Sequence, residues 1–266
     1  MAVICFLYSL DIKGLVKPKG DRGINSTPNA SETINSQLIS SSAKMLLNAN
    51  LASQVTSIED AVKTASGAQK LALQKQLVQK WDDVNQPAPA AFISEEIALA
   101  QNSFKNWLVT GDKFTQAYTN YKDSSAIPAL VAKAILAYTK ALAINAASLD
   151  AKTGLGVAYV TEGKNPMQGI QLLLGVVKQQ PNNLKANMNL GLFSMKSGQF
   201  DKAVNRFKTV LTVQQSPEAY FYLATSYENL GAKPEAILAY AKSKELAADP
   251  GLTKFVDQKI KELNNK

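Results

Sequence analysis

Apolar positions between residues 149 and 250 follow a helical spacing that repeats about every 34 residues. A leucine beside a small residue stands at Leu155-Gly156 and recurs at Leu190-Gly191 and Leu223-Ala224, after steps of 35 and 33 residues. A second helix in each unit carries a small residue and a bulky one four places apart, in the pairs Gly169 and Leu173, Ala203 and Phe207, and Ala236 and Tyr240. Self-similarity at this period predicts a solenoid built from helical hairpins.

Glycines separate the two expected helices of each unit, and prolines close it. Gly163, Gly198 and Gly231 stand at the turns, where the missing Cβ makes a positive φ inexpensive. The closing prolines are Pro181, Pro217 and Pro250. Each unit is therefore expected to hold two helices joined by a tight turn.

The last two units resemble the tetratricopeptide repeat family. The residues that match its pattern are Leu190-Gly191, the run 198–203, Phe207 and Leu211, followed by Tyr220, Leu223-Ala224, Tyr227, Leu230-Gly231 and Ala236. The unit that starts at Leu149 has one extra residue around Asn165-Pro166, and no unit has the family's first-helix tryptophan. The resemblance implies an all-α fold, a right-handed helical solenoid.

A partial repeat is expected upstream of these units. Six residues match a second helix, namely Ala134, Ile135, Tyr138, Ala141, Leu142 and Ile144. Its first helix is expected near Phe114 to Tyr121, before an irregular loop at residues 123–125. The solenoid would then span residues 111–250 with about three and a half repeats. Residues 251–266 are predicted to form a capping helix, because the last repeat of a solenoid exposes apolar surface.

Residues 37–110 are predicted to form an N-terminal helical region. Apolar stripes lie on both sides of Gly67, at Leu51, Val55, Ile58 and Val62 and then at Leu71, Val78 and Trp81. They predict a helical hairpin or a short coiled coil, which either packs on the first repeat or mediates self-association.

Three boundaries are expected inside this region. Thr56 and Glu59 have the spacing of a capping box, which indicates a helix start. Residues 87–89, Pro-Ala-Pro, are expected to end the hairpin. Residues 94–96, Ser-Glu-Glu, are expected to start the helix that carries Phe104, Trp107 and Leu108.

The amino terminus has the composition of an incomplete membrane anchor. Residues 2–10 are apolar apart from one serine, which is too short for a spanning helix of about 20 residues. A basic flank and a linker rich in Ser, Thr and Asn follow over residues 11–36. We therefore expect a membrane-anchored bacterial protein of this family, with an anchor that is truncated at residues 1–10. By analogy with envelope proteins its soluble part is expected on the periplasmic side, with the cytoplasm as the alternative.

Composition argues against catalysis and against metal or cofactor binding. The chain has no histidine and one cysteine, Cys5, which removes the commonest base and metal ligands. The carboxylate pairs Asp82-Asp83 and Glu95-Glu96 are interpreted as a helix end and a helix first turn. The chain is therefore expected not to be an enzyme.

The net charge of +8 makes nucleic acid and anionic lipid candidate partners. Only Arg22 and Arg206 are arginines, and phosphate recognition relies on the guanidinium group. Lysines spread over helix exteriors instead indicate a solvated surface, so no nucleic-acid partner is expected.

The resemblance implies that the first helix of each repeat lines a concave groove that holds a peptide or helix of a partner protein. The register assigns this partner-binding groove to Thr153, Val157, Lys185, Met188, Asn189, Leu192, Met195, Phe221, Tyr222, Thr225 and Glu228. Methionine and aromatic side chains offer adaptable apolar contacts. The apolar members are equally compatible with packing against neighbouring helices.

Family members that bind chaperone tails hold the terminal carboxylate with Lys, Asn and Arg. Of the matching positions only Asn189 fits, and Glu218 would repel a carboxylate. The expected function is therefore a non-catalytic scaffold that binds another type of protein segment while tethered to a membrane. The alternative is a structural protein of the cell envelope that forms homo-oligomers through residues 38–85.

Overall fold

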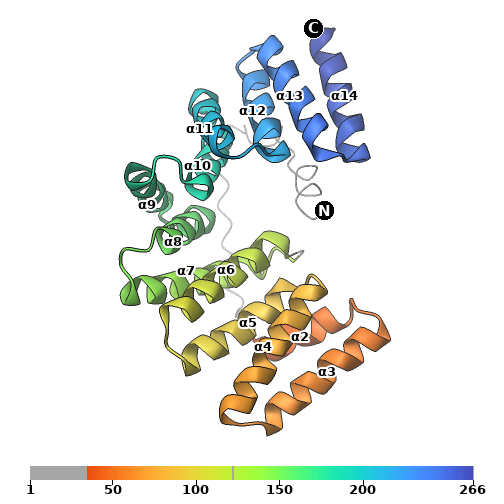
Figure 1. Cartoon of the computed structure of the whole chain (residues 1–266), viewed down its shortest axis with the longest axis vertical. Coiled ribbons are helices and arrows are strands. Elements are labelled where there is room, and N and C mark those ends of the chain that lie inside the picture. The colour runs from red at the N-terminus through yellow and green to blue at the C-terminus, as the bar shows by residue number, and fades with distance from the viewer. Residues whose placement is uncertain (1–34, 122, 266) are drawn as a thin grey trace, which may run out of the picture. The chain divides into compact units, whose positions relative to one another are not determined.

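A computed structural model describes residues 35–121 and 123–265 of the chain. These residues form thirteen helices and no strand, which confirms the predicted all-α fold (Figure 1). The apolar run at residues 1–10 and the linker up to residue 34 lie outside the described residues, so both expectations stay predictions. The chain divides into two compact units between Leu173 and Leu174, inside α9 (Pro166–Gln179), and each unit is described by itself.

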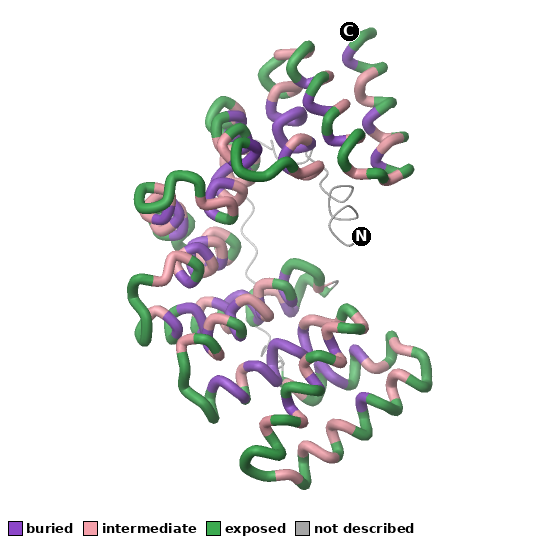
Figure 2. The backbone as a smooth tube through the Cα atoms, in the orientation of Figure 1, coloured by how far each residue is buried: buried purple, intermediate pink, exposed green. Residues whose placement is uncertain are grey.

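The N-terminal unit contains α2 (Ser36–Lys44), α3 (Ala49–Thr64), α4 (Gly67–Asp83), α5 (Pro87–Ala100), α6 (Phe104–Asn120), α7 (Ile127–Ile144), α8 (Leu149–Glu162) and the first half of α9. Successive helices from α3 to α8 pack on one another along the chain, and α2 packs on α5. The helical hairpin predicted around Gly67 is confirmed, since α3 packs on α4 and Gly67 has φ of +54°. Buried residues lie mainly along the sides where neighbouring helices meet (Figure 2).

The helix start predicted from Thr56 and Glu59 is wrong. Both residues lie inside α3, which starts at Ala49 after the N-cap Asn48, whose side chain accepts a hydrogen bond from Leu51 N at 2.9 Å. Glu59 accepts hydrogen bonds from Ser40 and Lys44 on α2 instead of closing a cap. Spacing alone cannot separate a capping box from an ordinary pair three residues apart on one helix face.

The boundaries predicted around residues 87–96 also differ from the structure. Pro87 is the first residue of α5 rather than the end of the hairpin. Proline is tolerated in the first turn of a helix, because the N–H that it lacks would have no partner within the helix there. Ser94 and the Glu95-Glu96 pair lie in the middle of α5, where Ser94 Oγ donates to the Ala90 carbonyl at 2.8 Å. Phe104, Trp107 and Leu108 belong to the separate helix α6, which begins after the N-cap Ser103.

The first helix of the partial repeat is longer than predicted. It is α6, which begins at Phe104 rather than near Phe114, so the expected boundary at residues 110 and 111 falls inside it. Gly111 is the small residue of this repeat, because a Cβ placed there would stand 2.6 Å from the Tyr138 ring on α7. Tyr138 lies 27 residues after Gly111, whereas Phe207 lies 16 residues after Gly191. The extra residues around the α6–α7 loop explain why the sequence period missed this first helix.

Helix α7 is apolar and long enough, at 18 residues with mean hydropathy 1.6, to span a membrane by length and composition. Its buried residues instead belong to the core of the N-terminal unit, where α7 packs between α6 and α8. Tyr138 is 1 % exposed and fits against Gly111 of α6 and Gly154 of α8. A third of the residues of α7 are buried in this way, so packing within the repeat accounts for that face of the helix.

The C-terminal unit contains two repeats and the predicted capping helix. Its helices after α9 are α10 (Leu184–Lys196), α11 (Phe200–Val213), α12 (Pro217–Asn229), α13 (Lys233–Ala247) and α14 (Pro250–Asn264). The turn glycines Gly198 and Gly231 of this unit have φ values of 74° and 75°, and Gly163 of the N-terminal unit has 79°, as predicted. Helix α14 adds Leu252, Val256 and Leu263 to the core.

Candidate functional site

One face of α10 carries five of the residues assigned to the groove. Met188, Leu192 and Met195 are half-buried and pack against the core of the C-terminal unit. Asn189 is half-buried, and its side-chain amide donates to the Lys185 carbonyl at 2.8 Å. Lys185 is exposed. We call these five residues the α10 face, which combines partly accessible apolar side chains with an amide and a cation.

The corresponding residues on α12 are mostly in the core. Phe221, Tyr222 and Thr225 are each 6 % exposed. The Phe221 ring lies 5.7 Å from that of Tyr240 on α13 and 5.9 Å from that of Phe255 on α14, centroid to centroid. Tyr222 stacks on Phe207 of α11 at 5.6 Å. These aromatic side chains join α12 to its neighbours and leave little surface for a partner.

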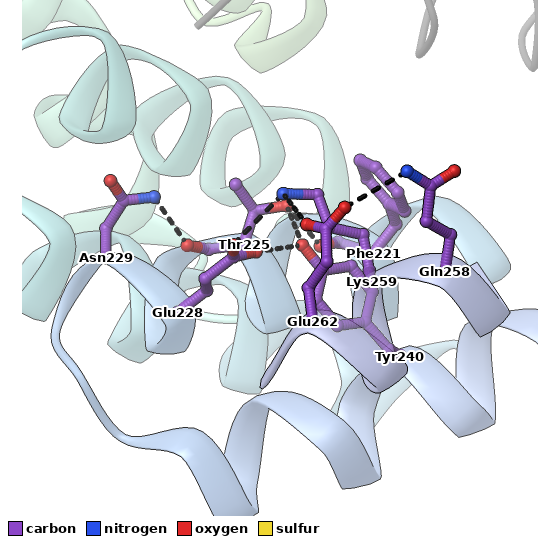
Figure 3. A network of polar contacts seen from close by, with 8 residues as sticks. All are labelled: Phe221, Thr225, Glu228, Asn229, Tyr240, Gln258, Lys259 and Glu262. Carbon is purple, nitrogen blue, oxygen red and sulfur yellow. Dashed lines mark hydrogen bonds and ion pairs between the residues drawn. The ribbon is translucent and has the colours of Figure 1, made fainter. Parts of the chain in front are cut away.

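A polar network connects α12, α13 and α14 around Glu228 (Figure 3). The Tyr240 hydroxyl donates to Glu228 Oε2 at 2.7 Å and lies 3.2 Å from Thr225 Oγ1. Lys259 Nζ donates to Glu228 Oε1 at 3.0 Å. Burial, together with the Glu228 carboxylate, raises the pKa of the Tyr240 hydroxyl well above its usual value. Glu228 thus holds the capping helix in place.

The same arrangement recurs in the N-terminal unit. The Tyr138 hydroxyl donates to Asp112 Oδ1 at 2.8 Å and lies 3.0 Å from Thr115 Oγ1. Burial and the Asp112 carboxylate raise the pKa of Tyr138. Asp112 lies one place and Thr115 four places after Gly111. Thr225 and Glu228 occupy the same two places after Ala224, with the acid and the hydroxyl residue exchanged. The register that defines the groove positions therefore extends to α6.

The assigned residues on α8 lie close to the core. Thr153 is 3 % exposed and its hydroxyl donates to the Leu149 carbonyl at 2.8 Å, whereas Val157 is half-buried. Of the assigned residues, Thr153, Phe221, Tyr222 and Thr225 are thus buried and the others are at least partly accessible. Their joint role in binding a partner stays a prediction.

Sequence reasoning missed a pocket between α4, α5 and α6. Its volume is about 150 Å³, and its apolar lining comes from Val78, Ile97 and Val109. Two exposed lysines, Lys75 and Lys105, also line it. Lys105 and Val109 precede Gly111 by six and two places, as Lys185 and Asn189 precede Gly191. Recognising Gly111 as the small residue of a repeat would have revealed Lys105 and Val109 as groove positions of α6.

The carboxylate pairs hold helices together. Asp82 of α4 binds Lys113 of α6 at 2.6 Å, and Glu95 of α5 binds Lys133 of α7 at 2.6 Å. The interpretation of Asp82-Asp83 as a helix end is confirmed, because α4 ends at Asp83. Across residues 35–121 and 123–265, no group of three or more His, Cys, Asp or Glu side chains could hold a metal ion.

These observations define a class of protein: a repeat protein of stacked helical hairpins, with small residues on first helices and bulky residues on second helices at the contacts. Residues 194–252 match a family model described as tetratricopeptide repeat. This part of the chain is therefore similar to the tetratricopeptide repeat family. None of the curated proteins compared with it matches in sequence.

Solved structures with a similar fold include two of the protein MamA. One is MamA from residue 41 to its end, from Desulfovibrio magneticus RS-1, with 17 % identity, a TM-score of 0.50, and coverage of 68 % of this chain and 97 % of that one. The other is a double mutant of MamA from RS-1, with 18 % identity, a TM-score of 0.50, and coverage of 73 % and 99 %. At 17 % and 18 % identity this likeness concerns the fold alone.

Proposed function

We propose that the chain is a non-catalytic scaffold that binds a segment of a partner protein on the first-helix faces of its repeats. The α10 face carries this proposal, because Met188, Leu192 and Met195 remain partly accessible although they pack on the core. Methionine adapts its shape to different apolar partners, which suits a surface that binds a peptide or a helix. The neighbouring Asn189 and Lys185 add polar contacts that would orient the segment.

The capping helix restricts the surface that the C-terminal unit offers. Phe221, Tyr222 and Thr225 are enclosed by α11, α13 and α14, and Glu228 is bound by Tyr240 and Lys259. A partner segment would therefore contact α10 rather than α12.

Site-specific photo-crosslinking tests this proposal without disturbing the core. A photoreactive phenylalanine analogue replaces Asn189 on the α10 face or, as a matched control, Lys208 on α11, which is exposed. In native cells the Asn189 position is expected to crosslink to a discrete partner that the Lys208 position does not reach. Identical crosslinks from both positions would refute the assignment. Circular dichroism of each purified variant controls for folding.

We further propose that the protein is tethered to a membrane by its amino terminus, with the repeats on the periplasmic side. The apolar run at residues 2–10 and the basic flank after it support this proposal. The native protein is expected to stay with the membrane pellet after a carbonate wash of lysed cells. Added protease should digest the repeats in spheroplasts whose inner membrane is intact. Release by carbonate would contradict the tether, and protection from the protease would place the repeats in the cytoplasm.

A further inference from the structure

The pocket between α4, α5 and α6 has an apolar floor whose polar groups are already satisfied. Ile97 and Ser94 are 6 % and 5 % exposed, and Val109 at the edge is 39 % exposed. Ser94 Oγ donates to the Ala90 carbonyl, and its own carbonyl accepts from Thr110 Oγ1 at 3.0 Å. The Asn106 amide donates to the Gln101 carbonyl at 2.9 Å. A ligand group on this floor gains from apolar contact rather than from hydrogen bonds.

The size of the pocket limits the group that enters it. A cavity of about 150 Å³ accommodates a benzene-sized molecule. A single leucine, methionine or phenylalanine side chain is of this order, whereas a whole helix is not. The pocket is thus suited to one anchoring side chain of a longer segment.

Positive charge at the rim of the pocket favours acidic residues on both sides of the anchoring side chain. Lys75 on α4 and Lys105 on α6 are both exposed and line the pocket, and none of its lining residues is acidic. Within the described part of the chain neither lysine forms an ion pair. Other lysines of this unit are used internally, such as Lys113 with Asp82 and Lys133 with Glu95. Two uncompensated cations beside an apolar pocket complement carboxylates that flank an apolar side chain.

We propose that this pocket binds an acidic segment of a partner protein through one apolar anchor side chain, with Lys75 and Lys105 paired to the flanking carboxylates. The proposal rests on the proposed function, since it names the chemistry of a partner segment and a contact site on the N-terminal unit. It also follows the repeat register, because Lys105 and Val109 occupy on α6 the places that Lys185 and Asn189 occupy on α10.

A defined peptide tests the proposal with the full chain. The probe is an end-capped, fluorescein-labelled peptide in which one leucine stands between two pairs of glutamates, and fluorescence anisotropy measures its binding at low ionic strength. Wild-type protein is expected to bind it saturably. Replacing the glutamates by glutamine, or the leucine by serine, should weaken binding several-fold.

Matched variants separate the pocket from the general positive charge of the chain. Lys75→Glu with Lys105→Glu is expected to weaken binding about tenfold or more, whereas Lys70→Glu with Lys140→Glu, on exposed lysines outside the pocket, should change it less than about threefold. Val109→Glu should abolish binding, and Val213→Glu, at an exposed site on α11, should not.

Three results would overturn the pocket assignment: no binding by the wild type, equal weakening by the two double variants, or equal effects of the two valine variants. The crosslinks from Asn189 report on the α10 face independently of this peptide. If the peptide does not bind the pocket but the crosslinks depend on position, the scaffold function stands and the pocket assignment fails. If the crosslinks do not depend on position, the α10 face is refuted as the partner site, whatever the peptide does.

Discussion

At the scale of single residues, close contact between glycines and aromatic rings sets the spacing of the helices. Tyr138 is 1 % exposed and fits between Gly111 on α6 and Gly154 on α8. Phe207 packs in the same way on Gly191 of α10. The missing Cβ allows the helices to approach, and the ring fills the space that this leaves.

Gly111→Ala is expected to destabilise the protein by about 1–3 kcal/mol, because the new Cβ would stand 2.6 Å from a ring that cannot move away. Gly175→Ala is the matched control, since no atom lies within 4 Å of its new Cβ. That control should be stabilising by about 0.5–1 kcal/mol through helix propensity. Urea unfolding followed by circular dichroism measures both changes. Equal stability of the two variants would contradict the packing argument.

Buried tyrosines predict a loss of stability at alkaline pH. Burial raises the pKa of Tyr222 to about 12, with a further contribution from Glu218, and the pKa values of Tyr138 and Tyr240 are raised as well. Above about pH 10 the unfolded chain loses these protons while the folded chain keeps them. The stabilisation is therefore complete below that pH and decreases as pH rises, by up to about 1.4 kcal/mol per pH unit for each tyrosine.

Urea titrations at a series of alkaline pH values measure this slope. Tyr240→Phe removes one titrating group and should make the decrease shallower, in addition to a loss of about 1 kcal/mol at neutral pH from the missing hydrogen bond to Glu228. An unchanged slope in the variant would show that Tyr240 does not contribute.

At the scale of elements, α14 acts as the end of the repeat array. Leu252 and Val256 are 1 % and 0 % exposed, and Lys259 fixes the helix to Glu228 on α12. The sequence predicted this helix because the last repeat of a solenoid exposes apolar surface. The structure adds that Phe255 of α14 contacts Phe221 of α12 and helps to bury it. The binding surface of α12 is reduced by the same contacts that stabilise it.

Leu252→Ala is expected to cost about 2–5 kcal/mol, because it leaves a cavity in the core between α14 and its neighbours. Leu238→Ala on α13 is the control, since that side chain is 69 % exposed and should change stability by less than about 0.5 kcal/mol. Thermal unfolding of both variants by calorimetry checks the difference. A cost at Leu238 equal to that at Leu252 would argue against the burial of α14.

At the scale of the whole molecule, the two compact units predict local rather than global responses to mutation. Each repeat of a solenoid contacts only its neighbours, so its stability is a sum of local contributions. Gly111→Ala lies in one unit and Leu252→Ala in the other. Cooperativity over the full length is therefore expected to be incomplete.

Hydrogen exchange with mass spectrometry tests this expectation. Gly111→Ala should speed exchange in α6 and α7 and leave α12 and α13 unchanged, and Leu252→Ala should do the reverse. Uniform acceleration along the chain in either variant would show that it unfolds as one cooperative unit.

Local signals predicted most of the helical framework. The glycine turns at Gly163, Gly198 and Gly231, the hairpin around Gly67 and the capping helix all follow from short-range spacing and backbone preference. The errors at Thr56, Ser94 and Phe114 have a common reason. A capping residue, a proline and a small residue each fit more than one helix position, and contacts with other helices decide among them.

For the candidate site, the sequence could predict which positions of each repeat share one helix face, but not which of them are accessible. The sequence alone determined the period, the all-α repeat fold and the residues that face the same side of each first helix, because these depend on helical geometry along the chain. The tertiary structure decided which of those residues remain accessible, since Phe221 and Thr225 are covered by side chains from α13 and α14 that are distant in sequence. It alone brought Lys75 and Lys105 to the rim of one pocket, because proximity between separate helices depends on packing rather than on period.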